Sequence, residues 1–329
     1  MLWGMAQSSQ VTTPSDAPVA AATLPPVEPG RTGRGPALRA ALPVLTVLLL
    51  WASAFIAIRF VAGAYAPVPL ALGRILVGTV ALAVILAVVS RRRGARPSLP
   101  RGRSLGLVVG YGVAWFAAYT VALNAAEHHL DAGTAAMVVN VAPLLVALTG
   151  GLLLGEGFPR RLLVGLLVGF AGVALIAAGG RGVHADGTGI ALGLVAAVLY
   201  AGGVLLQKVA LRTVDAVTGT FLGCLAGTVV LLPWLPELLH QVAAAPLGST
   251  LAVVYLGVGP TAVAFILWAR ALRASDAGRL TTTTLAVPAI TVLLSWGLLG
   301  EVPTAWAIAG GALALGGVAV SRTRPRRRA

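Results

Sequence analysis

The chain carries twice a stretch that begins with Asp131-Ala132-Gly133 and continues through Leu153-Leu154-Gly155-Glu156 to Gly172-Val173-Ala174. The second copy begins with Asp276-Ala277-Gly278 and continues through Leu298-Leu299-Gly300-Glu301 to Gly317-Val318-Ala319, always 145 residues later. Similarity at one fixed distance indicates an internal duplication. The sequence therefore predicts two copies of one structural unit.

The similarity extends toward the start of both copies. Gly78-Thr79-Val80 recurs as Gly227-Thr228-Val229, and Arg59 is matched by Lys208, at a distance of 149 residues in both cases. The larger distance indicates extra loop residues in the first copy. The expected organisation is a disordered tail (1–40), a first repeat (41–180), a second repeat (181–321) and a basic tail (322–329).

Apolar residues dominate the composition, since 58% of the 329 residues are hydrophobic and only 10% are charged. An ordinary soluble domain is much more polar, so we expect lipid as the surrounding solvent. The net charge of +14 does not indicate nucleic-acid binding, because the basic residues form short clusters between long apolar runs. The single cysteine, Cys224, permits no intramolecular disulfide and no multi-cysteine metal site.

Apolar runs follow one another along the chain, and each is long enough to cross a bilayer as a helix. The expected spans are 41–62, 68–89, 104–125, 132–154, 161–179, 187–207, 216–235, 249–269, 279–299 and 304–320. Five of them fall in each copy. The fold class predicted is therefore an all-α integral membrane protein with ten transmembrane helices in two five-helix repeats.

The positions of Lys and Arg predict the orientation, because cytoplasmic loops retain positive charge. With a cytoplasmic N-terminus, 21 of the 24 basic residues fall in tails and loops on the cytoplasmic side. An odd number of spans in each copy then turns the second copy upside down, so we expect an inverted repeat with both termini in the cytoplasm, in the cell membrane. Inverted repeats permit alternating access, in which two similar units open one central site to either face in turn.

The motifs and their double occurrence resemble the drug/metabolite transporter superfamily, and specifically its EamA-type members. The resemblance covers roughly residues 41 to 320 and is carried by the segment from Trp51 to Arg59, Arg74, Pro143, Gly155-Glu156, Gly172-Val173 and the second-copy counterparts. Known members move amino acids, drugs, sugars or other metabolites. The resemblance therefore implies transport, with export as the expected direction, and leaves the cargo open. The second copy departs from the pattern where Arg74 is matched by Gly223.

All ten acidic residues lie in tails, loops or helix ends of the expected topology. A proton-driven carrier usually keeps an ionisable group inside the membrane, and here we expect no carboxylate in that place. His128 and His129 are the nearest substitutes, although solvated loop residues are the simpler interpretation. The same lack of acid–base groups and of metal-ligand spacing argues against an enzyme, a cofactor or a metal centre.

Two repeated features predict structural roles. Glu156 and Glu301 each end a helix directly after a glycine, which favours a structural role for both. Pro143 and Pro288 lie in the middle of their spans, where a proline removes a helix hydrogen bond. We expect a kink or hinge at each proline, with local packing as the equal alternative.

Polar and aromatic residues in the middle of spans are the candidates for lining a central cavity. Two helix faces are prominent, an aromatic one on the third span and a hydroxyl-rich one on the ninth. The candidate substrate-binding residues are Trp51, Arg74, Tyr111, Trp115, Tyr119, Asn140, Tyr200, Trp268, Thr284, Thr291 and Ser295. For each residue alone, packing between helices is an equal alternative.

Arg74 differs from the other candidates because a guanidinium inside a membrane helix needs compensation. One form of compensation is snorkelling, in which the side chain extends toward the membrane surface. Because no carboxylate is expected within the membrane, the remaining partners are a backbone carbonyl, cavity water or an anionic group of the cargo.

We predict a membrane transporter, an exporter by resemblance, of a small organic metabolite or drug that binds in a cavity near the midplane. A receptor or assembly factor on the same fold is one alternative, and a membrane-embedded transferase is a weaker one. The expected partners are the organic solute and the lipid bilayer. The sequence leaves the cargo, the coupling ion and the oligomeric state open, a homodimer included.

Overall fold

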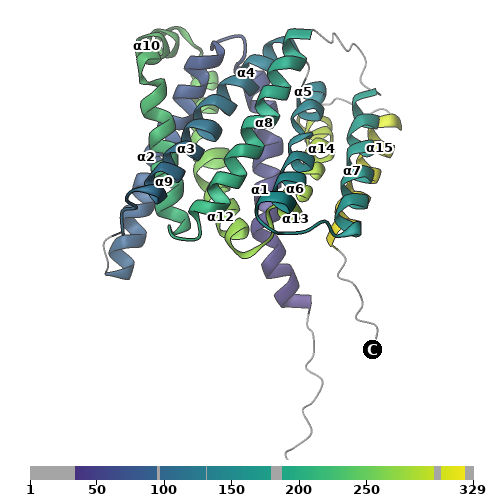
Figure 1. The fold of residues 1–329 in the computed structure, drawn as a ribbon. Helices are drawn as coiled ribbons and strands as arrows, with labels where there is room; N and C mark the ends of the chain where they lie inside the picture. Colours follow the sequence, from purple (N-terminus) through teal and green to yellow (C-terminus); the bar gives the residue numbers. More distant parts are fainter. Residues whose placement is uncertain (1–33, 95–96, 131, 179–186, 300–304, 323–329) are drawn as a thin grey trace, which may run out of the picture.

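The computed structural model describes residues 34–94, 97–130, 132–178, 187–299 and 305–322, and every regular element in these ranges is a helix. The helices stand side by side in one bundle, and the last helix ends on the side of the bundle where the first one begins (Figure 1).

The first half consists of α1 (Arg34–Val61), α2 (Pro67–Arg93), α3 (Arg103–Tyr111), the π-helix η1 (Gly112–Tyr119), α4 (Thr120–His129), α5 (Ala132–Val139), α6 (Ala142–Leu153) and α7 (Arg160–Ala178). α3, η1 and α4 form one continuous helix. α1 begins before residue 41, where the first span was expected to start.

The second half consists of α8 (Gly187–Ala210), α9 (Ala216–Leu231), the 3-10 helix η2 (Leu232–Trp234), α10 (Leu235–Ala244), α11 (Leu247–Leu256), the π-helix η3 (Gly257–Val263), α12 (Ala264–Ala274), α13 (Ala277–Thr282), the 3-10 helix η4 (Thr283–Ala286), α14 (Val287–Leu299) and α15 (Ala305–Arg322). The two π-helices begin at Gly112 and Gly257, which are 145 residues apart like the repeated motifs.

By length and composition, 7 helical stretches of the described residues are able to cross a bilayer. Two shorter apolar helices, Ala142–Leu153 and Ile308–Ser321, accompany them. The apolar helices support the expected multi-pass membrane protein, while the number of ten crossings stays a prediction.

The two repeated prolines lie directly after irregularities in their helices, and a hinge at these places stays a prediction. Pro143 lies in the first turn of α6, after the chain has left α5 through a turn at Asn140 and Val141. Pro288 lies in the first turn of α14, directly after the 3-10 segment η4. A first turn tolerates proline because the missing N–H has no partner within the helix. Both prolines therefore begin new segments of interrupted helices.

Equivalent residues of the two copies meet inside the bundle. The hydroxyl groups of Thr79 on α2 and Thr228 on α9 lie 2.8 Å apart, and both side chains are buried. The two threonines occupy the same place in the repeated Gly-Thr-Val motif. Contact between a residue and its own equivalent is the geometry found beside a two-fold axis.

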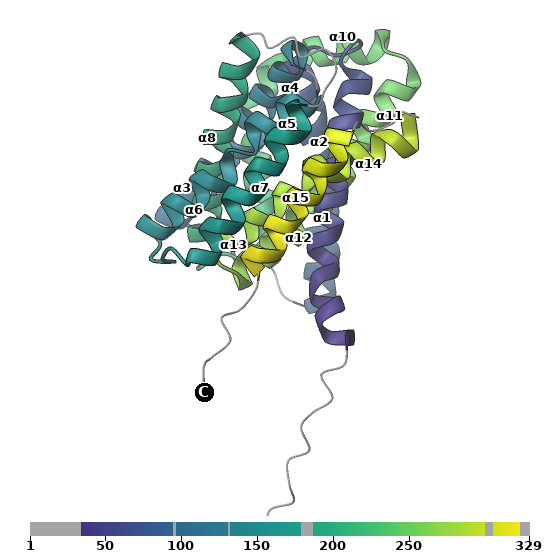
Figure 2. The same ribbon diagram turned by 90° about the vertical axis from the view of Figure 1, so that its right-hand side faces the viewer.

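α7 and α15 lie side by side at the right-hand edge of the bundle in Figure 1, and they face the viewer in Figure 2. Repeated glycines bring their backbones together, because a Cβ added at Gly165 would lie 2.6 Å from the carbonyl oxygen of Gly317. A Cβ at Gly172 would lie equally close to the carbonyl oxygen of Gly310. Small residues permit this approach between helices in a membrane, so the glycines of the repeated block serve helix packing.

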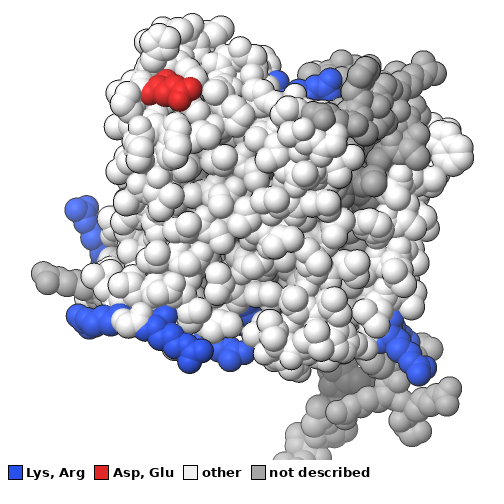
Figure 3. Space-filling model, turned by 45° about the horizontal axis from the view of Figure 1, so that its top comes forward, with Lys and Arg blue, Asp and Glu red and all other residues white. Residues whose placement is uncertain are grey.

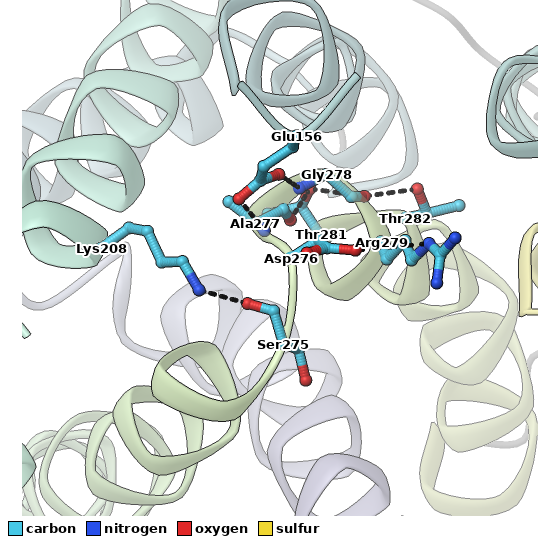
Figure 4. A network of polar contacts seen from close by, with 9 residues as sticks. All are labelled: Glu156, Lys208, Ser275, Asp276, Ala277, Gly278, Arg279, Thr281 and Thr282. Carbon is cyan, nitrogen blue, oxygen red and sulfur yellow. Dashed lines mark hydrogen bonds and ion pairs between the residues drawn. The ribbon is translucent and has the colours of Figure 1, made fainter. Parts of the chain in front are cut away.

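Glu156 joins the two halves where α6 ends and α13 begins (Figure 4). One carboxylate oxygen accepts a hydrogen bond from the amide of Ala277 at 2.8 Å, and the other accepts from Gly278 at 3.1 Å. Gly155 and Gly157 on either side have φ angles of 69° and 72°, which only glycine adopts freely. A carboxylate suits the unpaired N–H groups at a helix start. The contact supports the expected structural role, and Glu301 lies outside the described residues.

Lys208 adds a second contact at the same end of the bundle (Figure 4). Its ammonium group donates hydrogen bonds to the carbonyl oxygens of Leu272, at 2.8 Å, and Ser275. Most Lys and Arg side chains visible in Figure 3 gather along its lower edge. One end of the bundle is therefore basic, and hydrogen bonds there join α8 and the segment after α6 to the end of α12 and the start of α13.

Candidate functional site

A cavity lies between the two halves and is lined by helices of both. It holds about 590 Å³ of space between atoms, including its open side. Its lining residues are Trp51, Ala54, Phe55, Ile58, Arg74, Trp115, Tyr119, Leu123, Val139, Asn140, Pro143, Tyr200, Phe265, Thr284 and Val287. The predicted candidates that the structure brings together here are Trp51, Arg74, Trp115, Tyr119, Asn140, Tyr200 and Thr284.

Aromatic rings form one wall of the cavity. The ring centroid of Trp115 lies 4.9 Å from that of Phe265 and 5.1 Å from that of Tyr200, both at steep interplanar angles. Trp51 lies 5.6 Å from Phe265 in the same kind of arrangement. Edge-to-face contacts are the favourable geometry for aromatic pairs. Gly203 leaves the space for Trp115, because a Cβ at Gly203 would lie 2.7 Å from that of Trp115.

Arg74 brings a positive charge to the cavity. The side chain is 6% exposed, and its Nε donates a hydrogen bond of 2.9 Å to the hydroxyl oxygen of Thr261 in η3. This partner corrects our expectation, because a side-chain hydroxyl was not among the partners that the sequence suggested.

The π-helix η3 explains why Thr261 is available to Arg74. Pro260 has no N–H, so the backbone there cannot complete the normal helical hydrogen bond to Leu256. The hydroxyl of Thr261 donates to the Leu256 carbonyl instead, at 2.8 Å. A hydroxyl donates one hydrogen bond and still accepts others, so its oxygen is free to accept from Arg74. The carbonyl of Pro260 accepts from the indole N–H of Trp51 at 3.2 Å.

Tyr111 does not line the cavity, although it continues the aromatic series of Trp115 and Tyr119. Its hydroxyl donates a hydrogen bond to the carbonyl oxygen of Gly219, and its ring packs directly against Gly223. The absence of a side chain at Gly223 leaves the space that this ring fills. Tyr111 therefore packs α3 against α9.

Two further candidates, Trp268 and Thr291, lie outside the cavity lining. Trp268 packs behind Trp51, with ring centroids 4.9 Å apart. The hydroxyl of Thr291 lies 3.0 Å from the carbonyl oxygen of Val287 in its own helix and 3.4 Å from that of Ala52 in α1, so it packs α14 against α1. The side chain of Ser295 lies outside the described residues.

The sequence did not predict several residues that line the cavity, nor Thr261, the hydrogen-bond partner of Arg74. Phe55, Leu123 and Phe265 line the cavity but are apolar residues in apolar spans, so nothing in the sequence distinguishes them. Thr261 had a usable signal, because a Pro-Thr pair inside an apolar run marks a helix irregularity with a hydroxyl beside it.

Glu127 lies in the last turn of α4, at a helix end as we expected for the acidic residues. The third span was predicted to end at residue 125, but the helical stretch that includes α3, η1 and α4 continues to His129. Both carboxylate oxygens of Glu127 are buried and have no hydrogen-bond partner among the described residues. His128 and His129 are exposed. In the same described part of the chain, no group of three His, Cys, Asp or Glu residues is placed to hold a metal ion.

Comparison with known proteins places the chain in a family. The model of the EamA-like transporter family matches it twice, over residues 38–178 and residues 187–323. The chain belongs to the EamA-like transporter family. The family predicted from the repeated motifs is thus confirmed, and the protein is a membrane transporter.

Several relatives of this EamA-family transporter have curated names. It is 37% identical to a probable terminal-alkyne amino-acid exporter of Streptantibioticus cattleyicolor, over 87% of this chain and 94% of that protein. It is 30% identical to the aromatic amino acid exporter YddG of Ancylobacter novellus, over 68% of this chain and 75% of that protein. A solved crystal structure with 25% identity aligns with a TM-score of 0.70 over 86% of this chain and 96% of that one.

Proposed function

We propose that this transporter exports amino acids with an apolar side chain by alternating access to the cavity. One observation carries the proposal: the guanidinium of Arg74 lines a cavity whose other lining groups are mostly aromatic or aliphatic. This pairing of one cation with an apolar wall suits a cargo that has a carboxylate at one end and an apolar group at the other.

The two parts of the site suit the two parts of an amino acid. A carboxylate binds a guanidinium through two parallel N–H···O hydrogen bonds. Arg74 engages Thr261 through Nε, so its terminal nitrogens are the groups that we assign to the carboxylate. The apolar side chain then packs against Trp51, Trp115 and Phe265.

Tyr200 offers a further polar contact. Its hydroxyl oxygen is buried and has no hydrogen-bond partner among the described residues, although its ring lines the cavity. A buried hydroxyl without a partner loses free energy that a ligand restores. We assign it to the polar end of the cargo.

The names of the relatives support this cargo class. One is named for terminal-alkyne amino acids and the other for aromatic amino acids, and both kinds of cargo join an amino-acid group to a rigid side chain with π electrons. The cavity of the present chain has the aromatic wall that such side chains favour.

For the fold, we propose ten crossings in two inverted five-helix repeats with both termini in the cytoplasm. The contact between Thr79 and Thr228 and the pairing of α7 with α15 support the two-fold relation. The basic residues support the orientation. The contacts of Glu156 and Lys208 then close the cytoplasmic end, and alternating access requires them to open in the other state.

Reporter fusions test the topology. A reporter that is active only in the cytoplasm should work when fused after residue 98, and one that is active only outside should work when fused after residue 129. The opposite pattern at either site contradicts the orientation and with it the inverted repeat.

Flux through the purified protein in lipid vesicles tests the cargo. L-phenylalanine and L-propargylglycine should be transported, whereas phenethylamine, which lacks the carboxylate, and glycine, which lacks the apolar side chain, should be transported at least about tenfold more slowly. Equal flux of phenethylamine and L-phenylalanine would contradict the role of Arg74. Vesicles without protein and vesicles with the Arg74→Gln variant are the controls.

A further inference from the structure

Glu127 is a buried carboxylate close to the cavity. It lies one helical turn beyond Leu123 and two beyond Tyr119, and both of these residues line the cavity. Neither of its oxygens is exposed or hydrogen-bonded among the described residues. An ionised carboxylate in such a place is costly unless another charge compensates it.

Two arginines lie on helices that pack against α4, Arg74 on α2 and Arg59 at the end of α1. Arg59 is exposed to solvent, whereas Arg74 is buried beside the cavity. Neither arginine forms an ion pair with Glu127 within the described chain. Arg74 is therefore the buried cation on the helices packed against α4 and, on the proposed function, also the binding partner of the cargo.

The other elements that pack against α4 are η1, α5 and α8. Tyr119 in η1 is the further titratable neighbour. α5 contains no titratable residue, and α8 contains none before Tyr200. On α4 itself, His128 and His129 follow Glu127 and are exposed. Arg74 is thus the group whose occupation by a ligand changes the electrostatic surroundings of Glu127 most.

We infer that Glu127 takes up a proton when an anionic group of the cargo binds Arg74, so that cargo and proton bind cooperatively. The inference rests on the proposed function in one respect, the binding of the cargo carboxylate to Arg74. A negative group on Arg74 cancels the charge that stabilises ionised Glu127. The proton comes from bulk water, and no bond other than O–H forms.

The same coupling acts in the opposite direction, because linkage between two binding events is reciprocal. Protonated Glu127 no longer competes with the cargo for the field of Arg74. Carboxylated cargo therefore binds more tightly as the pH falls through the titration of Glu127, by up to about tenfold for each pH unit, which is the slope for one coupled proton.

Calorimetry on the solubilised full chain tests the coupling directly. The probes are 3-phenylpropionate and L-phenylalanine, measured across the pH range in buffers of different ionisation enthalpy. The wild type should take up protons on binding either probe. Glu127→Gln should bind both without proton uptake, at every pH about as tightly as the wild type binds at low pH. His128→Gln changes an exposed neighbour on the same helix, and it should behave like the wild type.

A second measurement needs no cargo. Dicyclohexylcarbodiimide reacts with protonated carboxyl groups in apolar surroundings, and mass spectrometry locates the product. Labelling of Glu127 should rise as the pH falls, and in Arg74→Gln the midpoint should move to higher pH because the counter-charge is gone. Arg59→Gln removes the exposed arginine and should move the midpoint less.

The two experiments separate the possible failures. A Glu127→Gln variant that keeps the pH dependence and proton uptake of the wild type overturns the inference. Labelling with the same midpoint in the wild type and Arg74→Gln also overturns it. A wild type that binds neither probe, while the labelling midpoint still shifts in Arg74→Gln, contradicts the proposed cargo and supports Glu127 as a proton site governed by Arg74.

Discussion

The contact of α2 with η3 and the contact of α9 with η1 are equivalent in the two repeats, and only the first of them carries a charge. The backbones approach in the same way: Gly257 packs on the carbonyl of Arg74, and Gly112 packs on the carbonyl of Gly223. Arg74 and Gly223 are equivalent positions in the repeats. Where the first contact has an arginine bonded to Thr261, the second has a glycine covered by the ring of Tyr111.

This difference shows how a duplicated scaffold acquires a one-sided site. The glycines that bring the helices together occur in both halves, since helix packing requires them in both. The position that reaches the cavity has diverged, and Thr261 is matched by the apolar Phe116. A single cation in a cavity with no other charged lining residue among those described distinguishes the two ends of a cargo, which a symmetric pair of charges would not do.

Replacement of Arg74 should have the largest effect on transport. Arg74→Gln removes charge-assisted hydrogen bonds worth about 1.5–3 kcal/mol, so we expect carboxylated cargo to bind about 10- to 100-fold more weakly. Arg74→Lys keeps the charge but loses the planar guanidinium, so its affinity for the cargo should lie between that of the wild type and that of Arg74→Gln. Binding and vesicle flux measure the effect. Unchanged affinity in a folded Arg74→Gln variant would contradict the cargo role, and Arg59→Gln serves as the matched control.

Gly223→Ala tests the other half of the comparison. An added Cβ would meet the ring of Tyr111, so the variant should lose about 1–3 kcal/mol of stability through overpacking. Gly202→Ala is the control, because nothing lies within 4 Å of a Cβ there. The thermal unfolding midpoints of the two solubilised variants measure the difference in stability. Equal stability of the two variants would show that the α9 contact is not packed as described.

The sequence predicted the scaffold well because packing glycines and apolar runs leave periodic traces. The repeated glycines of α7 and α15 and most of the polar and aromatic lining residues could be named without coordinates. Hydrogen-bond partners on different helices could not be predicted from the sequence. The pairing of Arg74 with Thr261, for example, joins residues far apart in the chain and depends on a π-helix. Tyr111 was misjudged for the same reason, because the space at Gly223 on another helix decides its surroundings.

Glu156→Gln addresses the end of the bundle where the second copy of the Asp-Ala-Gly motif begins. The amide retains one acceptor oxygen but loses the charge that favours a helix start, so we expect a loss of about 1 kcal/mol. The thermal midpoint should fall, whereas Glu237→Gln, which changes an exposed carboxylate in the first turn of α10, should lower it less because water screens that charge. A midpoint that falls equally in both variants would make the loss a general effect of charge.

Thr261→Val should have the smallest effect, and it isolates the hydroxyl that the first contact has and the second lacks. Valine keeps the shape of threonine and removes both the acceptor for Arg74 and the donor to the Leu256 carbonyl. One such hydrogen bond is worth about 0.5–1.5 kcal/mol, so cargo affinity should fall about 2- to 10-fold through a less well-held guanidinium.

The first repeat supplies the control for Thr261→Val. The hydroxyl of Thr120 also donates to a carbonyl five residues earlier, that of Trp115, at 3.4 Å, and Thr120 too is buried. Thr120→Val should therefore lower stability to a similar extent without changing the affinity for cargo. If both variants reduce the affinity for cargo equally, the hydroxyl of Thr261 acts by stabilising its own helix, and packing alone orients Arg74. A loss confined to Thr261→Val assigns the difference between the two repeats to the hydrogen bond.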